Sequence, residues 1–172
     1  VVDFKKRSFF FKKKNQYKIL LLSNIRKEKG IIVAISGFLE FQKNIDARTK
    51  FTLDHIGEVL DQDYFKKITN LSEGVKSVSF LGSIEKEKLQ TILASYDLLL
   101  HSSFIEGGSL VIQEAHNAGL PIIASDISCH TALLGSAYVG LHSVGSAIDI
   151  SEKLHTFFFD ELCRKQMETQ LS

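Results

Sequence analysis

Apolar runs alternate with stretches of helical periodicity along the chain from about Lys18 onward. An unbroken apolar run is typical of a strand buried on both faces, and an apolar residue every three to four positions is typical of a helix with one buried face. The segments that we expect to be strands are 18–24, 51–57, 78–82, 97–103, 121–125 and 137–144. The segments that we expect to be helices are 30–42, 60–71, 84–96 with Ser83 as its cap, a stretch from about Ser109, and the chain beyond Ser146.

This alternation predicts an α/β fold with a doubly wound, open parallel sheet of about six strands and helices on both faces, a Rossmann-like arrangement. In such sheets ligands bind beyond the carboxyl ends of the strands. We therefore expect the functional site in the loops that follow the predicted strands, at Asn24, Gly57, Gly82, Ser103 and Ser125.

Charge is distributed unevenly along the 172 residues. The first 18 carry seven Lys or Arg against one Asp, a net +6, and the remainder carries 14 against 19, a net −5. Lysines interleaved with Phe9–Phe11 are compatible with a membrane surface or a nucleic-acid backbone, but the segment has neither a long apolar core nor a signal-cleavage site. We expect residues 1–17 to be a basic linker or a truncated first element of a longer protein, and 18–172 to be one folded domain. Nucleic-acid binding is not expected, and membrane association is not indicated.

Cysteine usage gives no sign of a structural metal or disulfide. Cys129 and Cys163 lie far apart and lack CxxC spacing. This pattern predicts neither a zinc site nor a disulfide framework, and a reducing cytoplasm is the expected compartment.

The stretch "HSSFIEGGSLVIQEA" (101–115) combines a strand end, two glycines and two carboxylates. Gly107 and Gly108 let the backbone approach a ligand closely, and the helix that follows presents unpaired N–H groups and a positive dipole end, which suits a phosphate or diphosphate. With 100° per residue counted from Leu110, Glu114 falls at about 40°, inside the apolar arc. A carboxylate turned inward needs a partner, so Glu114 is either a paired structural residue or a ligand contact.

Carboxylates accept hydrogen bonds from hydroxyls, and a helix start binds a diphosphate. A molecule with both groups is a nucleotide sugar, which is the hypothesis that the residues favour. A second stretch, "NIRKEKG" (24–30), places Arg26, Lys27 and Lys29 after the first strand, where a cation could neutralise a leaving diphosphate.

Several stretches resemble a known family. Glu106, seven residues, Glu114 and then "AGLPIIASD" resemble the donor-binding carboxyl-terminal domain of GT-B glycosyltransferases of family 4, as do "NIRKEKG" and "VSFLGSIEKEKLQTILASYDLLLHSS". The resemblance covers residues 18 to about 165. "HIGEVLDQDY", "HSSFIEGG" and "LLGSAYVGLHSVG" are more similar to one branch, of the selenosugar synthase type.

The resemblance implies one half of a GT-B fold, with an amino-terminal acceptor-binding domain absent from this chain. It implies sugar transfer with retention from a nucleotide diphosphate sugar, a UDP-sugar being favoured, with no metal or other cofactor required. Glu106, at the donor sugar hydroxyls, and Lys29, at the diphosphate, would be the catalytic residues, and Glu114 would accept the ribose hydroxyls. Backbone N–H groups for sugar and diphosphate would come from Gly107, Gly108, Ser109 and Leu110.

Two departures from the family pattern keep other functions open. Asn24 stands where the family has a diphosphate-binding Arg, so either Arg26 substitutes for it or Asn24 leaves a weaker contact. The segment 126–130, "DISCH", expected to be a loop, lacks the usual glycines. The alternatives are a non-catalytic GT-B-like binding module and, ranked last, a sugar-nucleotide epimerase. Without an acceptor domain we expect the isolated chain to be catalytically silent.

The remaining candidates have equally good structural interpretations. His101 ends the fourth predicted strand and could contact the sugar, but a hydrogen-bonded buried histidine explains it as well. His55 and His130 have the topology to line the cleft, and adjacency of Cys129 to His130 does not predict a nucleophile pair. Phe157–Phe159 are expected to pack a terminal helix against the sheet or the absent domain.

Overall fold

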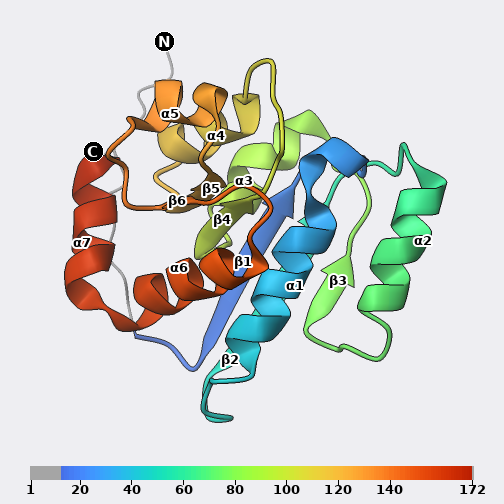
Figure 1. Cartoon of the computed structure of the whole chain (residues 1–172), viewed down its shortest axis with the longest axis horizontal. Coiled ribbons are helices and arrows are strands. Elements are labelled where there is room, and N and C mark those ends of the chain that lie inside the picture. Colours follow the sequence, from blue (N-terminus) through green and yellow to red (C-terminus); the bar gives the residue numbers. More distant parts are fainter. Residues whose placement is uncertain (1–12, 172) are drawn as a thin grey trace.

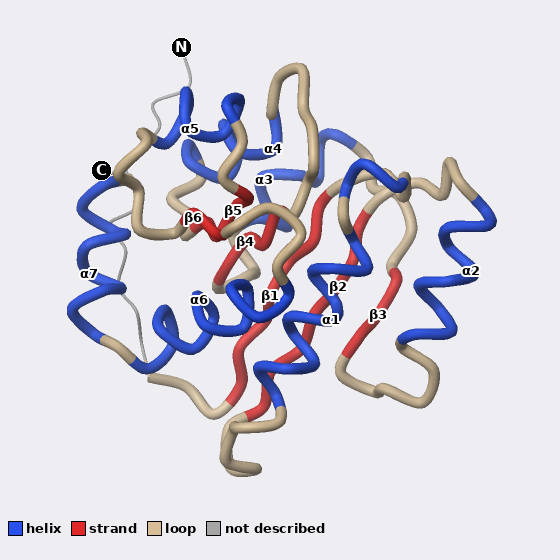
Figure 2. Tube along the Cα trace, in the orientation of Figure 1, coloured by secondary structure: helices blue, strands red, loops and turns tan. Residues whose placement is uncertain are grey.

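The strands of the chain form one parallel sheet. In the computed structural model, which describes residues 13–171, six strands pair in the order β3-β2-β1-β4-β5-β6 (Figure 2). This is the doubly wound order, so the predicted fold class is confirmed. The strands are β1 (Gln16–Leu22), β2 (Lys50–Ile56), β3 (Val78–Phe80), β4 (Leu98–His101), β5 (Ile122–Ser125) and β6 (Leu141–His142).

Helices cover both faces of the sheet. Figure 1 shows α1 and α6 side by side in front of the strands, with α3 and α4 behind them. The helices are α1 (Ile31–Gln42), α2 (Gln62–Leu71), α3 (Leu89–Leu93), α4 (Leu110–Asn117), α5 (Ser128–Leu134), α6 (Ala147–Phe159) and α7 (Glu161–Gln170), with short 3-10 turns η1 (Lys27–Lys29) and η2 (Lys86–Lys88). Helices α1 and α6 pack so closely that a Cβ added to Gly37 would lie 2.5 Å from Ile150 Cγ2.

The core lies between the two helical layers. β4 and β5 are buried along their whole length, as expected of central parallel strands covered on both faces. At the amino ends of β1 and β2, the ring of Phe158 packs on Tyr17 and Phe51, with ring centroids 4.9 and 4.8 Å apart. This contact bears out the predicted packing of the terminal helix against the sheet, although Phe159 is half exposed.

Three predicted elements differ from the structure. Ser83 does not cap a helix, because the exposed segment "KEK" forms η2 first and α3 begins only at Leu89. Helix α5 occupies part of the segment expected to be a loop; its one buried residue is a histidine, so it shows no apolar stripe. β6 is only two residues long because residues 135–140 form turns, with Tyr138 N donating to Gly135 O and Leu141 N to Tyr138 O.

The amino-terminal prediction is only partly within the described residues. β1 begins at Gln16, two residues before the predicted boundary, and residues 1–12 lie outside the described part of the chain. Among residues 13–171, no helix has the length and apolar character needed to cross a membrane.

Candidate functional site

Two loops meet at the carboxyl edge of the sheet, one after β1 and one after β4. The Ser102 hydroxyl lies within donating distance of the carbonyl oxygens of Lys29 (3.1 Å) and Gly30 (3.0 Å), and Phe104 N donates to Glu28 O at 2.8 Å. The approach is so close that a Cβ on Gly30, whose φ is 61°, would lie 2.2 Å from Ser102 O. These ties fix the backbone of Lys29 beside the loop that carries Glu106.

The carboxylate of Glu106 is the centre of a hydrogen-bond network. Its Oε1 atom accepts from Lys29 Nζ and from Ser103 Oγ, each at 2.6 Å, and lies 3.1 Å from His101 Nε2. All three contacts are made by Oε1, so within residues 13–171 Oε2 takes part in no hydrogen bond. The structure therefore brings together Lys29, His101 and Glu106, which are up to 77 residues apart in the sequence.

Electrostatics hold Glu106 in its charged form. Burial opposes ionisation, but hydrogen bonds from His101, Lys29 and Ser103, together with the Lys29 charge, outweigh it. They hold the pKa of the Glu106 carboxyl well below its usual range. The side chains of Lys29 and Glu106 are only 21% and 10% exposed, so solvent screens this pair less than it screens a surface ion pair.

The glycine loop that follows is open. Gly107 and Gly108 are exposed, neither has a positive φ, and a Cβ on either would meet no atom within 4 Å. The N-cap Ser109 makes no side-chain cap, and its buried Oγ has no partner among the described residues. The first N–H groups of α4 are left without intrahelical acceptors, as at every helix start.

The predicted inward orientation of Glu114 is wrong. Leu110, from which the apolar arc was counted, is 70% exposed, and the buried residues of α4 are Ile112 and Ala115. Glu114 lies half-buried at the border of this face, and in the described part of the chain its carboxylate makes no hydrogen bond or ion pair. Periodicity gave the angles between side chains correctly, but not the rotation of the helix about its axis.

The other predicted residues of the β1 loop do not reach Glu106. Asn24 Oδ1 accepts a hydrogen bond from Glu58 N at 3.1 Å, which ties the β1 loop to the β2 loop. The exposed Arg26 lies 4.0 Å from Glu28. Of the three basic residues in this loop, Lys29 is the one positioned by the fold.

The two other histidines that were candidates for the cleft, His55 and His130, do not line an open one. His55 packs against Phe80 at 5.8 Å and is 1% exposed, and His130 is fully buried. Burial lowers the pKa of His55 to about 4, and burial together with His101 lowers that of His130 to about 4. His130 Nδ1 lies 2.8 Å from Ser125 O, and its ring is 5.1 Å from that of His101.

Two serines that the sequence analysis named only as strand ends, without a role of their own, complete the edge. Ser125 Oγ donates to Ser103 O at 2.6 Å, which joins the ends of β5 and β4, and Ser103 Oγ donates to Glu106. The only signal in the sequence was their position at strand ends. His101, Glu106 and His130 each offer one potential metal-ligand atom, all within 4.8 Å of one another.

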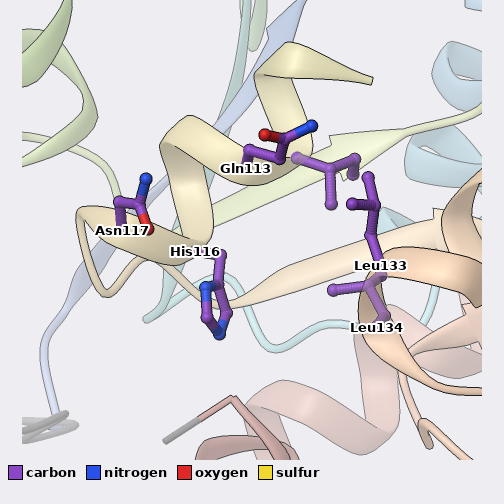
Figure 3. Close-up of a pocket in the computed structure, with 6 residues that line it drawn as sticks. Gln113, His116, Asn117, Leu133 and Leu134 are labelled. Atoms are coloured by element: carbon purple, nitrogen blue, oxygen red, sulfur yellow. The ribbon is translucent and has the colours of Figure 1, made fainter. Parts of the chain in front are cut away.

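Two cavities lie away from this network. One of about 130 Å³ lies between α4 and α5, lined by side chains that include Gln113, His116 and Leu133 (Figure 3). The other, of about 490 Å³, lies near the amino ends of β2 and β3 and includes Lys50 and Lys76. Neither contains a predicted site residue.

Comparisons with known proteins agree with this architecture. Residues 2–170 match the family model described as glycosyl transferases group 1. Curated relatives include glycosyltransferase 1 domain-containing protein 1 of Xenopus tropicalis (30% identical over 86 residues, 50% of this chain and 25% of the relative) and an alpha-monoglucosyldiacylglycerol synthase of Acholeplasma laidlawii (28% over 109 residues, 63% and 27%). The chain thus spans about a quarter of the length of these relatives.

Solved structures share the fold. Anabaena HepE, in complex with UDP and glucose, superimposes with a TM-score of 0.79 at 21% identity, covering 91% of this chain and 42% of that protein. The C-terminal domain of LpcC from Francisella tularensis, a glycosyl transferase group 1 family protein, gives 0.78 at 23% identity, covering 90% and 82%. The second match aligns this chain with most of a single carboxyl-terminal domain.

Proposed function

Because the chain belongs to the family described as glycosyl transferases group 1, we propose that it is the donor-binding domain of a retaining glycosyltransferase, with a nucleotide diphosphate sugar as donor. Family 4 is the proposed class. The finer selenosugar-synthase-like assignment is supported by the double glycine after Glu106 and by "LLGSAYVGLHSVG".

The observation that carries the proposal is the paired Lys29 and Glu106 beside an open glycine loop. Lys29 already neutralises Oε1 of Glu106, while Oε2 remains able to accept a hydrogen bond from a sugar hydroxyl. Gly107 and Gly108 leave the start of α4 accessible, so its N–H groups can receive the diphosphate. Glu114, half-buried and without a partner in residues 13–171, is the proposed acceptor for ribose hydroxyls.

The proposed reaction uses these groups for binding and charge stabilisation. The bond between the sugar C1 and the diphosphate oxygen breaks, a bond from C1 to the acceptor nucleophile forms, and the nucleophile's proton is released towards the departing diphosphate. Lys29, a cation at the carboxyl edge, stabilises the charge that develops on that diphosphate. The acceptor is held by a further domain, so this chain alone binds donor without turning it over.

UDP-sugars are the proposed donors. HepE, which shares the fold, has been solved with UDP and glucose and also with UDP-glucose. This supports a uridine nucleotide as the donor of this chain.

Isothermal titration of the chain with UDP, UDP-glucose, GDP and ADP tests the proposal. We expect a uridine nucleotide to bind, and Glu106→Gln and Glu114→Ala each to weaken UDP-glucose by roughly tenfold to a hundredfold, the about 1.5–3 kcal/mol of a hydrogen bond to a charged group. Glu152→Gln, at an exposed position on α6, is the matched control. If none of the four nucleotides binds, the proposal fails.

A non-catalytic binding module is the second candidate. Asn24, at the position of the family's diphosphate-binding Arg, is used by the fold to hold Glu58 N. The segment after β5 forms α5 in place of a glycine loop. A transfer or donor-hydrolysis assay on a longer protein that contains this domain separates the two, because turnover excludes the non-catalytic alternative.

A further inference from the structure

Three side chains from separate elements converge behind the open glycine loop: His101 at the end of β4, Glu106 in the loop after it, and His130 in α5. We propose that this histidine–glutamate cluster binds a divalent transition-metal ion of the Zn²⁺ class, which competes with the donor for Glu106. The competition rests on the proposed function; the metal site itself does not.

The hydrogen bond made by His130 fixes which of its atoms is available. Nδ1 lies 2.8 Å from the carbonyl oxygen of Ser125, so Nδ1 carries the proton and donates it. Nε2 then holds a lone pair, and this buried atom has no hydrogen-bond partner among the described residues. A histidine whose second ring nitrogen donates to a backbone carbonyl is the usual arrangement of a metal-ligating histidine.

The geometry and the donor types favour a particular class of ion. Two neighbouring ligands at roughly 2.1 Å from a tetrahedral ion are roughly 3.4 Å apart. His101 Nε2 and Glu106 Oε1 are 3.1 Å apart, and one potential ligand atom from each of the three side chains lies within 4.8 Å of the others. In the metal-free chain His101 Nε2 donates to Glu106; to bind the ion through Nε2, His101 takes the tautomer with its proton on Nδ1, and the ion replaces this hydrogen bond. A separation of 4.8 Å exceeds that spacing by about 1.4 Å, which side-chain rotations must close when the ion binds. Two imidazoles with one carboxylate suit Zn²⁺, Co²⁺ or Ni²⁺ better than Mg²⁺ or Ca²⁺, which prefer oxygen ligands.

Lys29 is the competing cation at this site. Its Nζ is 2.6 Å from Glu106 Oε1, and a divalent ion on the same carboxylate repels it. The Lys29 side chain is 21% exposed, so it has a route towards solvent. An ion that draws in Glu106 and displaces Lys29 removes two groups of the proposed donor site at once, and this makes the metal an inhibitor of donor binding.

Titration of the donor-free chain with Co²⁺ tests the site directly. We expect visible ligand-field absorption of a low-symmetry Co²⁺ complex, abolished by stoichiometric Zn²⁺, and calorimetry should give one Zn²⁺ per chain. His130→Ala and Glu106→Gln should each weaken Zn²⁺ by about a hundredfold or more. His155→Ala, at an exposed histidine of α6, is the matched control and should bind as the unmodified chain does.

Lys29→Met gives a result that loss of folding cannot imitate. Removing the ammonium should strengthen Zn²⁺ binding, by about tenfold, because the ion no longer has to displace a charge. His130 is fully buried, so circular dichroism is used to check that His130→Ala still folds. If it does not, the two single variants Glu106→Gln and Lys29→Met, with their opposite expected effects on Zn²⁺ affinity, test the metal site.

Competition is measured separately, by titrating UDP-glucose in EDTA and then at saturating Zn²⁺. We expect at least about a tenfold weaker donor affinity with Zn²⁺. Absence of donor binding in EDTA would contradict only the proposed function. Zn²⁺ affinity that is equal in the unmodified chain and in Glu106→Gln would overturn the metal site, and unchanged donor affinity at saturating Zn²⁺ would overturn the competition.

Discussion

The loops after β1 and β4 both carry glycines at the carboxyl edge of the sheet, but the backbone conformation and the space around these glycines differ. Gly30 has a φ of 61° and lies where a Cβ would be 2.2 Å from Ser102 O, so the fold itself excludes any other residue. Gly107 and Gly108 have no positive φ, and a Cβ on either would meet nothing within 4 Å. The fold has no need of glycine at these two positions.

The two kinds of glycine therefore serve different purposes at the carboxyl edge of the sheet, one in the fold and the other in ligand binding. Gly30 lets the two loops touch, which holds Lys29 against Glu106. Gly107 and Gly108 keep the entrance to α4 uncovered, and this matters only to a molecule that approaches from outside. A glycine required by the fold and a glycine required by a ligand are therefore distinguished by stability and binding measured on the same variants.

The largest effect is expected from Gly30→Ala. Alanine at a positive φ is strained, and here its Cβ would also collide with a backbone carbonyl that cannot move without separating the loops. We expect the free energy of unfolding in urea to fall by at least about 3 kcal/mol. A loss below about 1 kcal/mol would show that the loops can separate freely, and the architectural interpretation of Gly30 would be wrong.

Low pH should also reduce the free energy of unfolding, through the buried His55. Its ring is buried and its backbone partner is Ser23, at the start of the β1 loop; burial lowers its pKa from 6.5 to about 4. Below pH 6.5 the unfolded chain takes up a proton that the folded chain refuses until about pH 4, so stability falls as the pH falls through this window. The contribution of His55 between pH 6.5 and 4.5 is roughly 2 kcal/mol.

Comparison with His55→Gln isolates this group from the other titrating residues. We expect the difference in free energy of unfolding between the unmodified chain and the variant to shrink as the pH is lowered from 6.5 to 4.5. A difference that stays constant across that range would mean that His55 keeps an ordinary pKa in the folded chain.

The sequence was most informative where burial is symmetrical and least informative where contacts are long-range. The continuous apolar runs in β1, β4 and β5 predicted these strands because both faces of each are covered. Helix α5 gave no such pattern, and the apolar residues of 137–144 predicted a strand that is only two residues long in the structure. Topology predicted that Lys29 and Glu106 share one edge, but their pairing depends on a bond between loops 77 residues apart. The orientation of Glu114 depended on Leu110, an apolar residue that the fold leaves exposed.

Gly107→Ala should separate binding from stability in the opposite sense to Gly30→Ala. Its backbone conformation suits alanine, so we expect the free energy of unfolding to stay constant or to rise by up to about 1 kcal/mol. Donor affinity should fall by roughly tenfold, about 1.4 kcal/mol, because the methyl group stands where the ligand approaches. Calorimetry with UDP-glucose and a urea titration of the same preparation give both numbers. Unchanged affinity would mean that the donor does not approach the loop at Gly107.

The smallest effect is expected from Arg26→Ala, which tests whether proximity in sequence to Lys29 is enough for a role in the site. The Arg26 side chain is 51% exposed and its nearest charged partner, Glu28, is 4.0 Å away, so solvent and salt screen it. We expect UDP-glucose affinity to fall by about threefold or less, and the effect to vanish at high salt.

Lys29→Met, which removes the ammonium positioned by the fold, should reduce UDP-glucose affinity by roughly tenfold to a hundredfold at any salt concentration. Lys27→Ala, in the same exposed turn, is the matched control. An exposed, screened cation can contribute as much as the half-buried Lys29 only by direct contact with the ligand. If Arg26→Ala weakens donor binding as much as Lys29→Met does, the diphosphate therefore lies further out along the β1 loop than the Lys29–Glu106 pair.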